Sequence, residues 1–302
     1  MKQIIKKGSF LTLMFLLLGC LSLYAADNGL ITKQITIELE KAGTLPDRIT
    51  SIKKYEITNL KIIGEINGTD LRMIREMAGR DYISNSTDGK LSVLDLSKAK
   101  IVEGGVCYYY DCYTSNDVIG DRAFEGCSGL TSLTLPAGIT KIGSDAFRGC
   151  SGLTNLTLPA GITEIGYSAF EGCSGLTSLT LPAGITWIGS NAFDGCSGLT
   201  SIYVYSKKVP LIAGNAFEGF GAKKCTLYVP MGTRDDYCAS DFGNYFENIV
   251  EFEATGIDKT TISTDVEEVA RYSVNGQQLS APTKGLNIVK YSDGSVKKVA
   301  VQ

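Results

Sequence analysis

Histidine is absent from the 302 residues of this chain. This absence excludes catalysis of the Ser-His-Asp and Cys-His types, and it excludes any metal site with an imidazole ligand. A glycine-rich phosphate-binding loop and a CxxC pair are also missing. Two carboxylates facing each other across a groove would allow glycoside hydrolysis, but the pattern of acidic residues predicts no such groove. We therefore expect no enzymatic activity and no cofactor.

An excess of charge of either sign is also missing. The chain has 29 Lys and Arg residues against 32 Asp and Glu residues, which gives a formal net charge of -3. Nucleic acids and anionic membranes attract strongly basic surfaces, so this balance gives no electrostatic reason to expect either partner.

What the sequence does contain is one phrase that is repeated from Val118 to Thr233. The first copy reads VIGDRAFEGCSGLTSLTLPAGIT, and two near-identical copies follow. Two further copies have diverged from this sequence. The phenylalanines of successive copies are evenly spaced, except that the last comes one position late: Phe124, Phe147, Phe170, Phe193 and Phe217. Their period of about 23 residues and the pattern L-x-x-L-x-L are typical of leucine-rich repeats.

The sequence LTSLTLP in each unit predicts a short strand. Its leucines alternate with threonine and serine, so the leucines would point inward. Proline ends the strand, since it cannot donate to a ladder. A brief helical turn then carries the phenylalanine. One unit cannot bury its own apolar face, so the units must stack, with the phenylalanines in a column. We expect a left-handed conformation for the glycines before the strands, Gly129, Gly152, Gly175 and Gly198.

Four units carry a cysteine at the same position: Cys127, Cys150, Cys173 and Cys196. Metal binding would need ligands that converge on one point, whereas stacking places equivalent side chains in a row about 4.8 Å apart. Oxidation of neighbouring thiols is the second alternative. The regularity of the repeat favours a third, a ladder of small buried thiols that act as hydrophobic residues.

The phrase AF-x-GC-SGL-T-L-LP-GIT resembles the BspA-like leucine-rich repeat family of bacterial surface proteins, and the resemblance covers Val118 to Thr233. It implies a secreted or cell-surface protein that acts in adhesion and recognition. The expected partners are then a host or bacterial surface protein, a matrix component or a glycan.

Residues 1–26 are typical of a secretory signal peptide, with Lys2, Lys6 and Lys7 before an apolar run and small residues at its end. The stretch Leu17 to Cys20 also resembles a lipoprotein processing site, which would make Cys20 a lipid anchor. Continued apolar residues after Cys20 favour ordinary cleavage near Ala25 or Ala26. The remaining alternative, a transmembrane anchor, is disfavoured because the run is short for a bilayer.

Residues 27–105 are interpreted as an amino-terminal cap with degenerate repeats. Alternation predicts a strand over residues 57–63, and Thr69 or Asp70 would cap a helix that runs to Met77. Such atypical ends cover the apolar surface of a terminal unit.

Residues 106–117 form an insertion that is rich in tyrosine: Tyr108, Tyr109, Tyr110 and Tyr113. Exposed tyrosines would suit recognition of a protein or a sugar, and the alternative is that the rings pack over the edge of the repeats. Cys107 and Cys112 flank the cluster and would close a small disulfide in an oxidising compartment.

The preferred binding site lies on the outward strand face, where Tyr203 and Tyr205 interrupt a surface of serine and threonine next to Thr180. The only tryptophan, Trp187, shares an outward position with Lys141 and Glu164 of neighbouring units and is a second candidate contact. Ion pairs between such charged neighbours are exposed and therefore weak.

Residues 234–253 resemble the closing cap of the same family. Cys225 and Cys238 are candidates for a disulfide in this cap, but the sequence does not establish their pairing. Residues 254–266 suit a linker. Residues 267–302 predict three short strands and are similar to the sorting domains of the type IX secretion route of Bacteroidetes, with a small accessory sheet as the alternative.

These observations predict an α/β fold that leans to mainly β. We expect a curved leucine-rich repeat solenoid, with short parallel strands on one face and helical turns or irregular segments on the other. Two functions are compatible with it: non-catalytic recognition, and a structural spacer of the bacterial cell envelope.

Overall fold

The computed structural model describes residues 29–219 and 221–253, apart from the side chain of Asn155, and the backbone of four strands between residues 268 and 301. The chain divides into two compact units, Met1–Ala254 and Thr255–Gln302. The predicted signal peptide with Cys20, and the predicted linker, lie outside the described residues. Among the residues that are described, no helix has the length and apolar character needed to cross a membrane.

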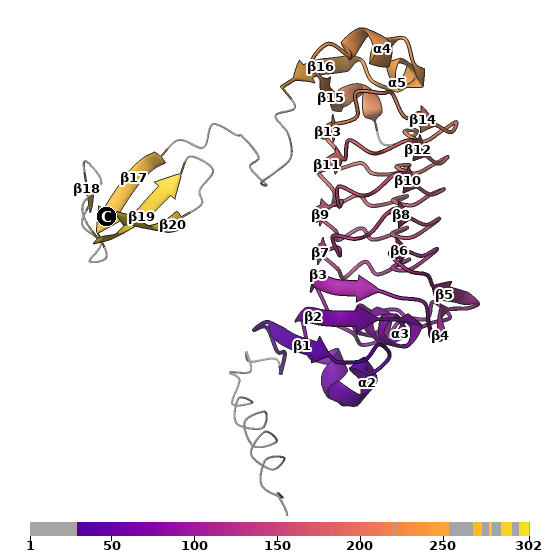
Figure 1. The fold of residues 1–302 in the computed structure, drawn as a ribbon, viewed down its shortest axis with the longest axis vertical. Helices are drawn as coiled ribbons and strands as arrows, with labels where there is room; N and C mark the ends of the chain where they lie inside the picture. Colours follow the sequence, from indigo (N-terminus) through magenta and orange to yellow (C-terminus); the bar gives the residue numbers. More distant parts are fainter. Residues whose placement is uncertain are drawn as a thin grey trace, which may run out of the picture. The chain divides into compact units, whose positions relative to one another are not determined.

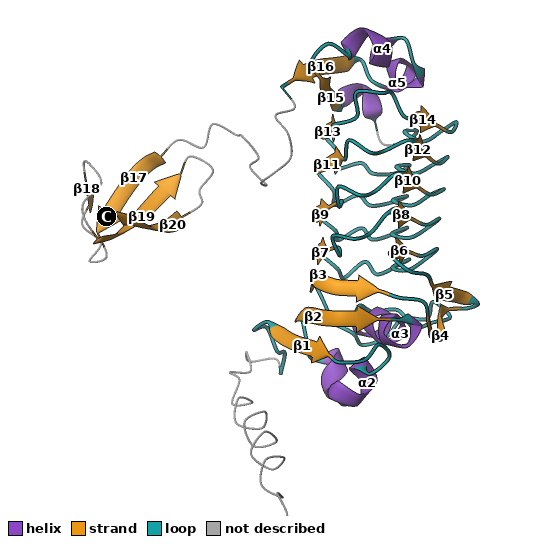
Figure 2. Ribbon diagram, in the orientation of Figure 1, coloured by secondary structure: helices purple, strands orange, loops and turns teal. Residues whose placement is uncertain are grey.

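The first unit begins with parallel strands that lead directly into the repeats. Strands β1 (Ile35–Leu39), β2 (Asn59–Ile66) and β3 (Val93–Ile101) pair in parallel, and β3 pairs with the first repeat strand. The short helix α2 (Leu45–Arg48) and the 3-10 turn η1 (Lys53–Tyr55) connect β1 to β2, and helix α3 (Gly68–Met77) follows β2. Within the described residues of this unit, helices lie only at its two ends (Figure 2).

Helix α3 begins earlier than the sequence predicted. Its N-cap is Asn67, whose side chain accepts from the N–H of Thr69 at 3.0 Å, while the Asp70 carboxylate accepts from the N–H of Asn67 at 2.9 Å. Asp70 is therefore the second half of a capping box rather than the cap itself. The same carboxylate accepts from the N–H of Leu45 at 2.9 Å, which ties α2 to the start of α3.

The repeats place one strand of each unit in a parallel stack (Figure 1). These strands are β7 (Ser132–Thr134), β9 (Asn155–Thr157), β11 (Ser178–Leu181), β13 (Ser201–Val204) and β15 (Thr226–Pro230). On the other side, a second parallel sheet is formed by β6 (Val118–Ile119), β8 (Lys141–Ile142), β10 (Glu164–Ile165), β12 (Trp187–Ile188) and β14 (Leu211–Ile212). The expectation of short parallel strands is confirmed.

The phenylalanines form a stacked column in the core of the repeats. Successive rings from Phe124 to Phe217 are nearly parallel, with centroids 5.2 to 5.5 Å apart. All five rings are buried, so each unit supplies an aromatic layer that neither neighbour can replace.

The four cysteines form a second buried column beside the phenylalanines. Each thiol after the first donates to the carbonyl oxygen of the phenylalanine one unit back: Cys150 to Phe124 at 3.0 Å, Cys173 to Phe147 at 3.1 Å and Cys196 to Phe170 at 3.0 Å. These three thiols therefore pack as small hydrophobic residues and also donate one weak hydrogen bond each.

The expected left-handed conformation of Gly129, Gly152, Gly175 and Gly198 is wrong. The left-handed glycines are those before the cysteines, such as Gly149 with φ 70°. Gly152, Gly175 and Gly198 are required by close stacking instead, because a Cβ on Gly152 would lie 2.3 Å from the carbonyl oxygen of Ser128 in the preceding unit, whereas a Cβ on Gly129 would meet nothing closer than 3.9 Å.

The carboxy-terminal end of the first unit is closed by η2 (Ala222–Lys224), α4 (Arg234–Cys238), α5 (Asp241–Tyr245) and β16 (Asn248–Phe252), which pairs in parallel with β15. The rings of Phe242 and Phe246 lie 5.5 and 5.1 Å from Phe217, the last ring of the column. Buried Tyr237 donates its hydroxyl to the carbonyl of Ser206 at 2.7 Å. These contacts cover the last unit.

The second unit is an antiparallel sheet with the strand order β18-β17-β19-β20. Its strands are β17 (Glu268–Ser273), β18 (Gln278–Leu279), β19 (Gly285–Tyr291) and β20 (Val296–Val301). The sequence predicted β17, β19 and β20 but not the two-residue strand β18.

Candidate recognition surfaces

The strand face carries an aromatic cluster at its carboxy-terminal end, which we define as Tyr203, Tyr205, Tyr228 and Phe252. Tyr203 stacks on Tyr228 of the next strand, with centroids 4.4 Å apart and an angle of 7° between the rings. Phe252 of β16 meets Tyr203 and Tyr205 edge to face, at 5.8 and 5.0 Å. Thr180 lies beside Tyr203 in the register of β11 and β13, so the structure brings the predicted residues together.

All four rings of the aromatic cluster are half-buried. Tyr203 and Tyr228 each cover one face of the other, and the exposed remainder of the rings is accessible to a partner. Burial raises the pKa of the Tyr203 hydroxyl, and its neighbour Tyr228 raises it further, so this hydroxyl stays protonated at neutral pH and can donate.

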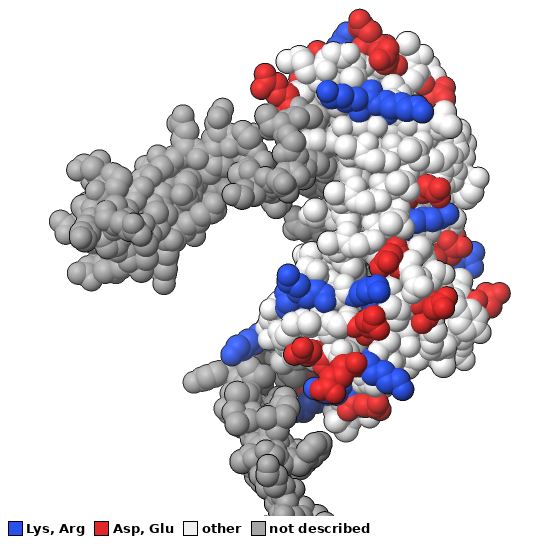
Figure 3. Space-filling view, viewed as in Figure 1, with Lys and Arg blue, Asp and Glu red and all other residues white. Residues whose placement is uncertain are grey.

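The strands that lead to the cluster carry no charge, whereas Lys207 and Lys208 follow Tyr205 closely, and Glu251 and Glu253 flank Phe252. The part of the stack that contains β9, β11 and β13 is largely free of Lys, Arg, Asp and Glu in the view of Figure 3. An uncharged strand face with tyrosines at one end is suited to many short-range contacts rather than to long-range electrostatic attraction.

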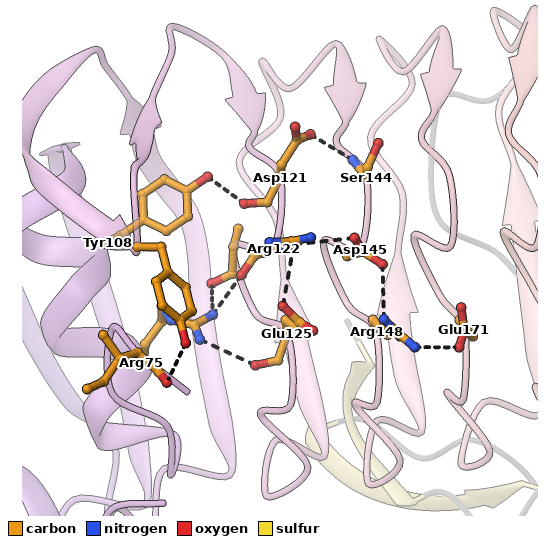
Figure 4. Close-up of polar contacts among 12 residues, drawn as sticks. Arg75, Tyr108, Asp121, Arg122, Glu125, Ser144, Asp145, Arg148 and Glu171 are labelled. Atoms are coloured by element: carbon orange, nitrogen blue, oxygen red, sulfur yellow. Dashed lines mark hydrogen bonds and ion pairs between the residues drawn. The ribbon is translucent and has the colours of Figure 1, made fainter. Parts of the chain in front are cut away.

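Tyr108 and Tyr109 do not belong to an exposed recognition cluster. Strands β4 (Gly104–Tyr109) and β5 (Cys112–Thr114) form a hairpin over the start of α3, and both rings are buried beneath it. The Tyr108 hydroxyl donates to the carbonyl of Asp121 at 2.8 Å (Figure 4). The Tyr109 ring lies 4.6 Å from the guanidinium of Arg75. For these two residues, packing over the edge of the repeats is the correct alternative.

Arg75 has a related structural role. Its guanidinium is fully buried and donates to the carbonyls of Arg122 at 2.7 Å and Ala123 at 3.0 Å, with a longer contact to the carbonyl of Glu125 at 3.4 Å (Figure 4). Arg75 and Tyr108 therefore satisfy the open carbonyls of the first unit, which has no preceding unit to donate to them.

Tyr110 and Tyr113, in contrast, are more than half exposed on the same hairpin. They are the part of the predicted tyrosine cluster that is accessible to a ligand. The flanking Cys107 and Cys112 are half-buried free thiols in this structure, and Cys225 and Cys238 are unpaired as well.

Trp187 lies on the second sheet, in register with Glu164 and Leu211. Its indole is half-buried because the Tyr167 ring packs against it edge to face at 5.2 Å. Tyr167 is the more exposed ring of this pair. On the same sheet Lys141 and Glu164 form an ion pair of 2.9 Å. In the turns after β8 and β10, Arg148 pairs with Glu171 at 3.1 Å (Figure 4).

Burial raises the pKa of every thiol in the cysteine column, to about 11 for Cys127 and about 12 for Cys196. These thiols are protonated at neutral pH and are poor metal ligands and poor nucleophiles. Among the described residues, no group of three or more His, Cys, Asp and Glu is placed to hold a metal ion.

Sequence reasoning missed Tyr228, Phe252 and Tyr167. Tyr228 alternates with inward-facing residues in its strand, as Tyr203 does. It lies in the copy that has diverged most, and it comes later than the regular period would place it. Phe252 follows the last repeat altogether. Tyr167 occupies a position where the other copies have Asp, Ser or Gly, and this difference was a usable signal.

The repeats and their strand arrangement define a leucine-rich repeat fold. Residues 117–240 match the family described as BspA type Leucine rich repeat region, in six copies. A search of curated proteins found none that matches the sequence.

Several solved structures are similar to parts of the chain. The leucine-rich repeat protein of T. pallidum is 26% identical, over 45% of this chain and 67% of its own, with a TM-score of 0.36. A leucine-rich repeat protein from Bacteroides ovatus is 25% identical, with a TM-score of 0.30, and the match spans 38% of this chain but only 37% of that protein. The pneumococcal vaccine antigen PcpA is 14% identical over 66% of this chain and 57% of its own, with a TM-score of 0.34.

Proposed function

We propose that this chain is a secreted or cell-surface recognition protein without catalytic activity, whose repeats form a curved solenoid. The partner is a host or bacterial surface protein, a matrix component or a glycan, and it is bound on the strand face. The observation that carries this proposal is the aromatic cluster of Tyr203, Tyr205, Tyr228 and Phe252, half-buried at the end of a strand face whose strands β9, β11 and β13 carry no Lys, Arg, Asp or Glu.

Tyrosine is well suited to such a surface. Each ring offers a large contact area at a low cost in conformational entropy, and its hydroxyl adds a hydrogen bond. Here the rings are already fixed by one another, so binding orders few additional side chains. The serine and threonine residues of the neighbouring strands extend this surface along the stack.

The test is binding of the purified protein to a panel of matrix proteins and glycans, beside a variant with Tyr203→Ser and Tyr205→Ser. We expect saturable binding of at least one member and a loss of about tenfold or more in the variant, which corresponds to about 1.4 kcal/mol. Tyr167→Ser, at an exposed ring in the turn after β10, is the matched control and should leave the affinity unchanged.

Two outcomes would count against this site. Equal binding by the double variant and the control would move the site away from the strand face. An absence of saturable binding across the panel would favour the structural-spacer function, in which the repeats only separate other parts of the cell envelope. Circular dichroism and thermal unfolding of each variant show whether its fold is retained.

The proposal also includes export of the protein through two terminal segments. Residues 1–26 act as a cleaved signal peptide, with lipidation at Cys20 as the alternative, and residues 267–302 act as a sorting domain for the type IX route. Expression in a bacterium that has this route, with and without residues 267–302, tests the second part. Accumulation of the shortened protein in the periplasm supports it, and unchanged surface delivery contradicts it.

A further inference from the structure

A second candidate site lies at the hairpin of β4 and β5, apart from the strand face and its proposed function. Tyr82, Ile83, Tyr110, Asp111 and Arg122 line an open cleft of about 540 Å³. This volume is within the range of about 300–1,000 Å³ that is typical of small-ligand sites. Its lining combines two aromatic rings with one carboxylate and one guanidinium.

The tip of the hairpin is held in an unfavourable conformation. Tyr109 pairs with Cys112, so Tyr110 and Asp111 form a two-residue turn, and Tyr110 has a φ of +41°. Asn or Gly is favoured at such a position, and a bulky aromatic residue there is uncommon. Strained residues of this kind gather at binding sites, where the surrounding structure maintains them.

The surrounding contacts fix both aromatic rings. The N–H of Tyr110 donates to the carbonyl of Tyr82 at 2.8 Å, and its hydroxyl reaches the carbonyl of Ile83 at 3.3 Å. The Tyr110 ring also packs on Tyr109 edge to face, with centroids 4.9 Å apart, yet it remains 53% exposed. The guanidinium of Arg72 lies 3.7 Å from the centre of the Tyr82 ring and holds it in place.

The two charged groups retain free hydrogen-bonding capacity. Arg122 contacts Asp145 at 3.4 Å and Glu125 at 3.8 Å, in both cases through Nε (Figure 4). Its two terminal nitrogens have no hydrogen-bond partner in the described part of the chain, and neither has the exposed carboxylate of Asp111. The cleft therefore presents guanidinium donors and a free carboxylate acceptor.

We infer that this cleft binds a neutral pyranose residue of a glycan. The apolar C–H face of the sugar packs on the Tyr110 ring, vicinal hydroxyls donate to Asp111, and their oxygens accept from the terminal nitrogens of Arg122. A neutral sugar is preferred over an acidic one, because Asp145 and Glu125 already balance Arg122 and Asp111 adds a further negative charge.

Saturation-transfer NMR with the purified protein tests this inference. The probes are the methyl pyranosides of glucose, galactose, mannose and N-acetylglucosamine, with methyl glucuronide as the acidic comparison. We expect at least one neutral probe to bind with a dissociation constant on the order of 1 mM. Methyl glucuronide should bind more weakly, and Asp111→Asn should reduce this difference.

Tyr110→Asn is the central variant, because Asn suits the left-handed turn and the protein should still fold. It should weaken binding of the neutral sugar by about tenfold, equivalent to about 1.4 kcal/mol. Tyr113→Asn is the matched control, since Tyr113 is similarly exposed on the same hairpin but does not line the cleft.

Equal binding by the two tyrosine variants would overturn the inference, and so would the absence of saturable binding by every neutral probe up to tens of millimolar. A preference for glucuronide would overturn the choice of a neutral ligand. The variant with Tyr203→Ser and Tyr205→Ser should bind the pyranoside normally. This arm separates the inference from the proposed function of the strand face.

Discussion

Arg75 donates from Nη1 to the carbonyl oxygen of Ala123, 3.0 Å away, in the position that a backbone N–H occupies in every later unit. The equivalent carbonyls of Ala146, Ala169, Ala192 and Ala216 each accept from the phenylalanine N–H of the preceding unit. In the same way, the Tyr108 hydroxyl donates to the carbonyl oxygen of Asp121, which in the described part of the chain has no backbone N–H from a preceding unit as its donor. At the other end, the N–H of Asn215 donates to the hydroxyl of Tyr245 at 2.9 Å. Side chains from the two caps thus act as the missing neighbours of the stack.

This relationship predicts that Tyr108→Phe destabilises the protein although it removes a single oxygen atom. The carbonyl of Asp121 would lose the donor that Tyr108 supplies, and the expected cost is about 1–3 kcal/mol. Tyr113→Phe removes the same atom from an exposed ring of the same hairpin and should stay within about 0.5 kcal/mol of the original protein. Denaturant unfolding of both variants measures the difference. Equal stabilities would mean that water satisfies the carbonyl.

The repeat could be predicted because it is local and periodic. A regular period fixes which leucines, phenylalanines and cysteines share a column, and the parallel register between units follows from it. The hydrogen bond of the thiol column was not predictable, since burial of a small hydrophobic residue explains the same pattern.

The contacts that close the ends could not be predicted from spacing. Arg75 lies 47 residues before Arg122, and a single arginine on a predicted helix is usually solvated. The tyrosine insertion was ambiguous for a related reason, because hairpin register decides which rings are buried. Tyr108 and Tyr109 turn inward whereas Tyr110 and Tyr113 remain exposed.

A substitution at one turn position of the repeat should increase the stability of the protein. Arg122, Asp145, Ser168, Asn191 and Asn215 all have positive φ, and Ser168 adopts +49°. Asn tolerates this conformation better than Ser, so Ser168→Asn should stabilise the protein by about 0.5 kcal/mol. Ser174→Asn, at an exposed position without positive φ, should not. A higher melting temperature only for the first variant supports the explanation, and equal shifts contradict it.

Two glycines with similar sequence surroundings should respond differently to alanine. A Cβ on Gly152 would lie 2.3 Å from the carbonyl oxygen of Ser128, whereas a Cβ on Gly184 would have its nearest neighbour at an ordinary 3.6 Å. Gly152→Ala must push two units apart and should cost about 1–3 kcal/mol. Gly184→Ala should be neutral or slightly stabilising. Unfolding by urea distinguishes them, and a neutral Gly152→Ala would show that the units can separate freely.

The thiol column should make stability fall at alkaline pH. Burial raises the pKa of Cys127 to about 11 in the folded protein, against about 8.5 for a free thiol in the unfolded chain. Between these values the folded state holds a proton that the unfolded state has released. Stability is therefore complete below pH about 8.5 and is lost as the pH rises, by about 1.4 kcal/mol per pH unit for this thiol.

Cys127→Ala isolates this effect, because the Cys127 thiol makes only a long contact of 4.0 Å to the carbonyl of Glu125 and has no preceding unit to donate to. The variant should be less stable at pH 7 because a small cavity remains, but its stability should fall less steeply between pH 8.5 and 10. Cys238→Ala, at an exposed thiol, should leave the slope unchanged. Urea unfolding under reducing conditions, repeated along this pH range, measures the slopes. Parallel curves for Cys127→Ala and the original protein would show that the buried thiol does not contribute to this pH dependence.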